Sequence, residues 1–185
     1  MRDLMVTLPV DTLTFSFTAL IADAQIYDKW VHYTTVWNGP TAPSGGQKAV
    51  DVVAVEIGSP PAICWLIEGK DFRVITNPPK PSNIGGLAQL VAGKVQDSIA
   101  GLNDAALNAT MPTENSLAAL AVSATAKRVV LHLEPHVGPH SALFPRAFRA
   151  SVFQKLKQLV RAIDPNPLVL NIADTPSAGV PWLVT

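Results

Sequence analysis

The chain has 185 residues, of which 48% are hydrophobic and 15% charged, and its 14 basic and 14 acidic residues give a formal net charge of zero. This length predicts a single domain over residues 1–185 with a core of its own, and a neutral chain has no overall field that attracts nucleic acid. A single cysteine excludes a disulfide framework, and no apolar run approaches the roughly 20 residues of a membrane span. Acidic residues near the N-terminus argue against a secretory signal. We therefore expect a cytoplasmic protein.

The N-terminal part predicts two strands separated by a helix. Apolar and hydroxyl side chains alternate over residues 12–18, which is typical of a half-buried strand. Residues 19–30 have helical spacing of their apolar side chains and predict a short helix. The β-branched and aromatic side chains of residues 31–37 predict the first strand of a central sheet.

The segment 38–48 is a loop by its glycine and proline content. Its Ser-Gly-Gly-Gln-Lys ending is not a phosphate-binding loop, because that motif needs Gly-Lys followed by Ser or Thr and then a helix. The loop leads into a strand instead. Gln47 and Lys48 are therefore candidates only for contact with a substrate beside that strand.

Two short apolar runs, residues 49–57 and 62–67, flank a Gly-Ser-Pro-Pro break and predict a buried β-hairpin. Glu68 and Lys70 share one face at the end of the second strand because side chains alternate along a strand. Antiparallel pairing would bring Asp51, on the first strand, close to Glu68. Two carboxylates are suitable ligands for Mg²⁺, and a neighbouring ammonium can orient water or stabilise charge on a phosphate.

This arrangement, Asp51 followed by Glu68-Gly69-Lys70, resembles the PD-(D/E)xK nuclease superfamily, although Val50 stands where the family often has proline. The resemblance is densest over residues 48–102. It implies an α/β domain with a restriction-endonuclease-like αβββαβ core, in which helices flank a central mixed sheet. It also implies that the two carboxylates hold Mg²⁺ or Mn²⁺ and that the lysine assists catalysis.

The resemblance implies two further contributions to the site. An acid from the first helix often joins the metal, and Asp23 or Asp28 would serve. The family also uses a polar residue of the helix after the hairpin, here the amphipathic segment 84–102 with Asn83 as its N-cap, where Lys94 is the first candidate and Gln89 the second. The alternative for Lys94 is a surface pair with Asp97, three positions away.

The C-terminal part predicts a helix from Pro112, a fourth core strand over residues 127–134, a basic helix over 145–163, and short strands over 168–173 and 180–184. Three histidines, His132, His136 and His140, follow one another at intervals of four. The prolines between them forbid one continuous helix, so a zinc site is a minority interpretation. Arg149 and Lys155 of the basic helix, with Lys48, are candidates for nucleic-acid contact; a solvated basic face is the alternative.

The sequence thus predicts a metal-dependent nuclease, a hydrolase of phosphodiester bonds with DNA as the expected substrate. The alternative is a nuclease-fold module that is inactive or depends on a partner and binds nucleic acid or protein in a bacterial defence or mobile-element system. The surplus of hydrophobic residues allows for a homodimer or a protein partner.

Overall fold

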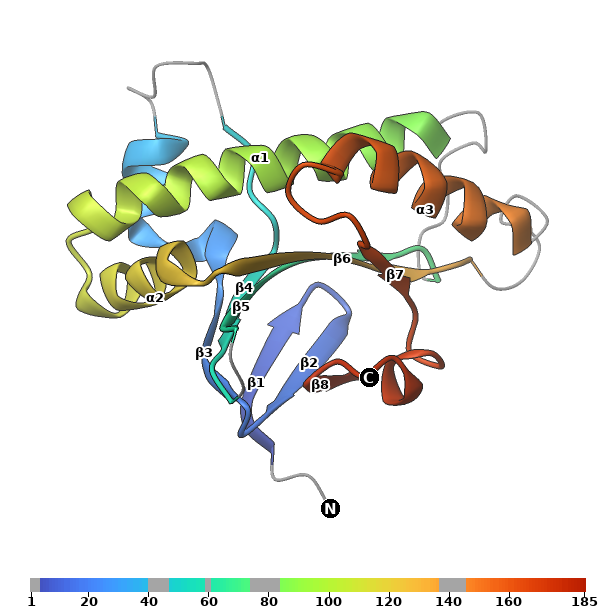
Figure 1. The fold of residues 1–185 in the computed structure, drawn as a ribbon, viewed down its shortest axis with the longest axis horizontal. Coiled ribbons are helices and arrows are strands. Elements are labelled where there is room, and N and C mark those ends of the chain that lie inside the picture. The colour runs from blue at the N-terminus through green and yellow to red at the C-terminus, as the bar shows by residue number, and fades with distance from the viewer. Residues whose placement is uncertain (1–3, 40–46, 59–60, 74–83, 137–145) are drawn as a thin grey trace.

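The computed structural model describes residues 4–39, 47–58, 61–73, 84–136 and 146–185. Its centre is a mixed five-stranded sheet in the order β3-β4-β5-β6-β7 (Figure 1). The first three of these strands are antiparallel neighbours, whereas β6 and β7 continue the sheet in parallel with β5. The strands are β3 (Ile21–Ile26), β4 (Val52–Glu56), β5 (Ile63–Asp71), β6 (Ala126–Glu134) and β7 (Leu168–Leu170).

The hairpin expected over 49–57 and 62–67 is confirmed as β4 and β5, which pair from Val52 opposite Ile67 to Glu56 opposite Ile63. The strand expected over 127–134 is confirmed as β6, which runs parallel to β5. Most residues of these three strands are buried, as expected for sheet strands covered on both faces.

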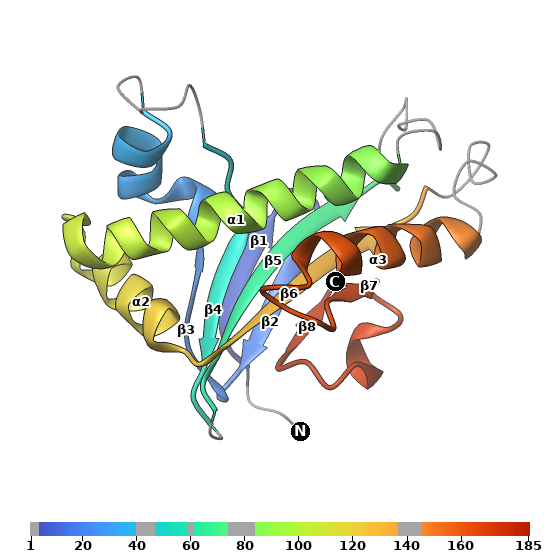
Figure 2. The same cartoon turned by 45° about the horizontal axis from the view of Figure 1, so that its top comes forward.

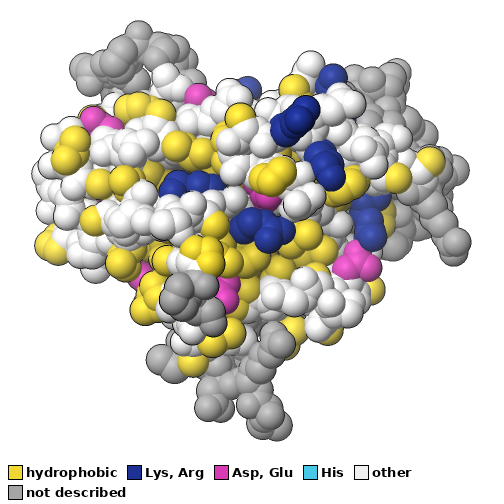
Figure 3. Space-filling model, in the orientation of Figure 1, with side chains coloured by type: hydrophobic (Ala, Val, Ile, Leu, Met, Phe, Trp, Pro, Cys, Tyr) yellow, Lys and Arg dark blue, Asp and Glu magenta, His cyan; other side chains and the backbone are white. Residues whose placement is uncertain are grey.

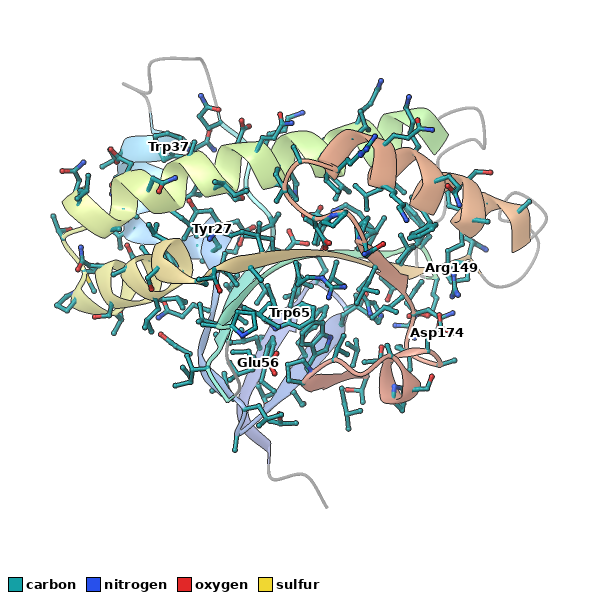
Figure 4. The ribbon with its side chains drawn as sticks, viewed as in Figure 1. Tyr27, Trp37, Glu56, Trp65, Arg149 and Asp174 are labelled. Carbon is teal, nitrogen blue, oxygen red and sulfur yellow. The ribbon has the colours of Figure 1, made fainter. Side chains whose placement is uncertain are left out.

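A second, three-stranded antiparallel sheet lies against one face of the first, in the order β1-β2-β8. The alternation over residues 12–18 is confirmed in β2, where Leu13, Phe15 and Phe17 are buried. Its strands are β1 (Leu4–Val10), β2 (Leu13–Thr18) and β8 (Trp182–Val184). Apolar side chains from both sheets form a core between them, in which Trp65 of β5 donates to Glu56 of β4 at 3.0 Å (Figure 4).

Helices cover the opposite face of the five-stranded sheet (Figures 1 and 2). They are α1 (Ile84–Asn108), α2 (Pro112–Ser123) and α3 (Arg146–Val160). The helices expected over 84–102 and 145–163 are confirmed as α1, which is six residues longer than expected, and α3. Asn83 lies outside the described residues. The buried side chains of these helices and of the facing strands form the larger of two cores. No helix in the described part of the chain is both long and apolar enough to cross a membrane.

The expectations for residues 19–30 and 31–37 were wrong. Half of the expected helix is strand β3, because residues 21–26 pair with β4 and bury Ile21 and Ala24 against the second sheet. The expected strand is helical: a 3₁₀ turn (Tyr27–Lys29) precedes it and it ends in a π-helical turn (Tyr33–Trp37). The first strand of the core meander is therefore β3.

Candidate active site

Four charged side chains meet on the helix-covered face of the central sheet. Asp51 directly precedes β4, and the register that pairs Val52 with Ile67 sets it opposite Glu68 on β5. Alternation along β5 places Glu68 and Lys70 on the same face as Leu66, which belongs to the core under the helices. The fourth residue, Lys94, comes from α1.

Hydrogen bonds and ion pairs connect all four residues. The Gly69 backbone N–H donates to Asp51 Oδ2 at 2.7 Å. Lys94 Nζ lies 2.7 and 2.9 Å from the two Glu68 oxygens and 3.4 Å from Asp51 Oδ1. Lys70 Nζ lies 2.6 Å from Glu68 Oε1. The hairpin thus brings the sequence-predicted carboxylates and lysine together, and α1 adds a second ammonium.

Burial makes the electrostatics of this cluster strong. The Glu68 side chain has no exposed surface, and burial together with the nearby Asp51 charge raises the pKa of Glu68 above its ordinary value despite both lysines. Burial alone would lower the pKa of Lys94, but the Glu68 and Asp51 carboxylates outweigh it and raise that pKa. The two carboxylates thus favour the charged form of Lys94, whereas burial and the Asp51 charge oppose ionisation of Glu68.

The surface pair considered for Lys94 is replaced by these contacts. Asp97 instead accepts the Lys48 backbone N–H at 2.9 Å, and Ser98 Oγ of the same helix accepts the Val50 N–H at 2.9 Å. α1 therefore fixes the segment that leads to Asp51. The sequence did not reveal this role of Asp97 and Ser98, because the partners lie 49 and 48 positions apart and carry no local signal.

Of the two acids considered as additional ligands, Asp28 lies nearer the site. Asp23 is on β3 and accepts a hydrogen bond from Gln25 at 2.8 Å. Asp28 lies in the 3₁₀ turn after β3, next to Tyr27, whose N–H donates to the Asp51 carbonyl at 2.9 Å. Burial raises the pKa of Asp28 above its ordinary value, Asp51 adds to the rise, and Lys29 and Lys94 oppose it. Asp28 Oδ1 is buried and makes no hydrogen bond within the described chain.

The donor set limits which metal the site would accept. Among the residues that the structure describes, no group of three or more His, Cys, Asp or Glu side chains is placed to hold a metal ion. Asp51 and Glu68 are a pair of hard oxygen donors, and Mg²⁺ is often bound through one or two carboxylates, with waters and substrate phosphates completing its shell. The two carboxylates therefore suit an ion such as Mg²⁺ that keeps several waters. They do not suit a metal whose ligands all come from the protein.

The residues considered for nucleic-acid contact are not equally available. Arg149 of α3 forms an ion pair with Asp174 (Figure 4), so its charge is already matched. Lys155 is partly exposed on α3, Lys48 is exposed beside the site, and Lys and Arg side chains gather around α3 on the face shown in Figure 3. Of the histidines, His132 pairs with Glu134 at 2.8 Å on the other face of the sheet, and His140 lies outside the described residues.

Comparisons with known proteins give one relative. No family model matches the chain, and no solved structure matches it. The chain is similar to a cysteine–tRNA ligase of Neisseria meningitidis, with 27% identity across 98% of this chain and 30% of the ligase. The chain thus spans less than a third of the length of that relative.

Proposed function

We propose that this protein is a metal-dependent nuclease that hydrolyses phosphodiester bonds of nucleic acid. The observation that carries the proposal is the register of the β4–β5 hairpin, which sets Asp51 opposite Glu68. Lys70 follows on the same face of β5 and reaches the same carboxylate. Asp51, Glu68 and Lys70 are the three residues that the PD-(D/E)xK resemblance requires. They lie together because β4 pairs with β5 in this register.

The topology supports the proposal as well. The antiparallel strands β3, β4 and β5, the α1–α2 crossover and the parallel strand β6 follow in the order that the restriction-endonuclease-like core would have. The chain departs from that core at its start, because strands β1 and β2 precede the meander where the core would begin with a helix. The helical segment 27–37 lies between β3 and β4 instead.

The side chains have distinct roles in this proposal. Asp51 and Glu68 would hold Mg²⁺ or Mn²⁺, and Asp28 is the nearest further acid. A divalent ion there supplies charge that stabilises a phosphate and lowers the pKa of bound water. The Lys70 side chain is 25% exposed and its ammonium contacts the buried Glu68 carboxylate. From there the ammonium would orient a water or offset negative charge as a point charge.

RNA joins DNA as a substrate class for this site. The sequence predicted DNA as the substrate, whereas the similar protein is by name a ligase of tRNA. Because the chain has no net charge, phosphate contacts would have to come from local side chains such as Lys48 and Lys155.

The second candidate is a protein with the same fold that binds a partner but does not catalyse the reaction. Lys70 and Lys94 neutralise both carboxylates, which favours the alternative of an inactive module that binds nucleic acid or a protein partner in a bacterial defence or mobile-element system. Fold alone does not decide between an enzyme and such a module.

Cleavage assays separate the two candidates. Duplex DNA, single-stranded DNA and tRNA would be incubated with Mg²⁺ or Mn²⁺ and with wild type, Lys70→Ala, Asp51→Asn or the control Arg161→Ala, whose side chain is exposed. We expect metal-dependent cleavage by wild type and the control, reduced at least about a hundredfold in the two site variants. Equal cleavage by all four proteins would refute the site, and binding without cleavage by wild type would favour the inactive module.

A further inference from the structure

The ammonium of Lys94 lies between the carboxylates that would bind the metal. Its Nζ contacts Glu68 Oε1 and Oε2 at 2.7 and 2.9 Å and Asp51 Oδ1 at 3.4 Å. Lys70, by contrast, contacts only Glu68 within the described ion pairs. Lys94 is therefore the one lysine of the cluster that bridges both acids, as a bound cation would.

We infer that Lys94 is an internal counter-ion that blocks the metal site in the free protein and is drawn away by a phosphate of bound nucleic acid. This inference rests on the proposed function and adds its regulation: metal binding and nucleic-acid binding would reinforce each other at this site. Lys94 is a positioning residue in this scheme.

The charge balance of the cluster explains why Lys94 opposes metal binding. Asp51 and Glu68 carry two negative charges, and Lys70 and Lys94 carry two positive charges, so the four residues are neutral together. A divalent cation added to a neutral, buried cluster meets both ammonium groups at short range. Removal of one ammonium leaves a net negative charge, and the carboxylate oxygens become free to bind a cation.

The position of Lys94 permits this exchange. The lysine side chain is long and flexible, and that of Lys94 is 18% exposed whereas Glu68 has no exposed surface, so the ammonium is the member of the pair that can reach solvent. Beside it on α1, a Cβ built at Gly93 would meet no atom of the described residues within 4 Å, so the helix surface next to Lys94 is not covered by them. In this scheme a phosphate approaches from solvent and meets the ammonium when the Lys94 side chain swings away from Glu68.

Linkage makes the inference quantitative. If bound nucleic acid raises the affinity for a divalent ion by removing Lys94 from the acids, the ion must raise the affinity for nucleic acid by the same factor. Couplings of this kind are typically about 5- to 150-fold. A Lys94 variant without charge should show the higher metal affinity in the absence of nucleic acid and should lose most of the coupling.

Mn²⁺ binding, followed by the electron paramagnetic resonance signal of the free ion, tests this directly. The proteins are wild type, Lys94→Met, the charge-conserving Lys94→Arg, and the control Lys157→Met, which removes a lysine of α3 that contacts Asn166. Each is titrated with and without a single-stranded phosphorothioate DNA oligonucleotide, with the oligonucleotide's own Mn²⁺ binding subtracted. Circular dichroism confirms that the variants are folded.

We expect Lys94→Met to bind Mn²⁺ at least about tenfold more tightly than wild type without the oligonucleotide, and Lys94→Arg and Lys157→Met to behave as wild type. The oligonucleotide should tighten Mn²⁺ binding to wild type by a similar factor and to Lys94→Met by little. Suppose that wild type binds Mn²⁺ and cleaves nucleic acid, but Lys94→Met binds Mn²⁺ no more tightly than wild type. That result would overturn this inference and leave the proposed function standing. If no protein binds Mn²⁺ under any condition, the proposed function fails together with it.

Discussion

The carboxylate of Glu114 on α2 accepts the backbone N–H of His32 at 3.0 Å, although the two residues lie 82 positions apart. Its other oxygen accepts the N–H of Val31 at 2.7 Å. The first N–H groups of a helical segment have no partner within the helix, so Glu114 caps the segment from a distant element. The position of α2 therefore helps to make residues 31–37 helical.

Replacement of Glu114 tests this cap. Glu114→Ala leaves two backbone N–H groups without their acceptor in a buried setting, and we expect the free energy of unfolding to fall by about 1–3 kcal/mol. Glu114→Gln keeps one acceptor oxygen and should cost less. Urea denaturation measures both variants, and an unchanged midpoint for Glu114→Ala would show that the cap contributes little.

This contact also shows what the sequence alone could establish. The β4–β5 hairpin and α1 follow from local apolar patterns, and with them the approach of Asp51 to Glu68, because register and alternation are short-range properties. The segment 19–37 could not be assigned in this way. Its strand is selected by pairing with β4 and its helical turn is capped by Glu114, both of which depend on residues far along the chain.

Two glycines of α1 provide a matched pair of variants. A Cβ at Gly101 would clash with Tyr27 Oη and lie 2.8 Å from Trp37 Nε1, so alanine there forces the buried Tyr27 ring and the partly buried Trp37 ring to move. We expect Gly101→Ala to lower the free energy of unfolding by about 1–3 kcal/mol. Gly93→Ala meets no atom within 4 Å and should raise it by roughly 0.5–1 kcal/mol, since alanine favours the helix.

Thermal unfolding of both variants against wild type gives the comparison, because the two changes are chemically identical and differ only in their surroundings. Equal effects at the two positions would contradict the close packing of α1 on Tyr27 and Trp37.

Asp71 makes stability depend on acidic pH. Hydrogen bonds from the Arg73 side chain, opposed by burial and aided by Thr12, lower the pKa of Asp71 to about 2 from its ordinary value of 3.8. Because the pKa is lower in the folded state, the stabilisation is complete above about pH 4 and is lost as the pH falls toward 2. The shift corresponds to at most about 2 kcal/mol, and we expect about 1 because Arg73 is partly exposed and screened by solvent.

Asp71→Asn should remove this dependence. Urea denaturation at a series of pH values from 7 to about 2 would show wild type losing more stability than the variant in the acidic range. Parallel curves for the two proteins would contradict the strength of the Asp71–Arg73 interaction.

The pair of Glu68 and Lys94 should show strong energetic coupling. Their contact is nearly dry, since Glu68 has no exposed surface, and breaking one side of a buried pair leaves an uncompensated charge. A double-mutant cycle of Glu68→Gln and Lys94→Met is expected to give a coupling free energy of about 1–3 kcal/mol.

The exposed pair of Arg149 and Asp174, whose side chains are 42% and 36% exposed, serves as the reference cycle. It should give well under about 1 kcal/mol. A similar coupling for the two pairs would mean that water reaches the Glu68 contact.

Strand β8 pairs with β2 through Phe17 opposite Trp182 and Phe15 opposite Val184, so the ends of the described chain meet in one sheet. During synthesis β2 leaves the ribosome before β8, so one hydrogen-bonding edge of β2 stays open until residues 182–184 emerge. While residues 19–181 are made, the nascent chain therefore exposes a strand whose Phe15 and Phe17 side chains are buried in the folded protein. Such an edge is a template for intermolecular pairing, so the protein is exposed to aggregation in the interval before β8 covers it.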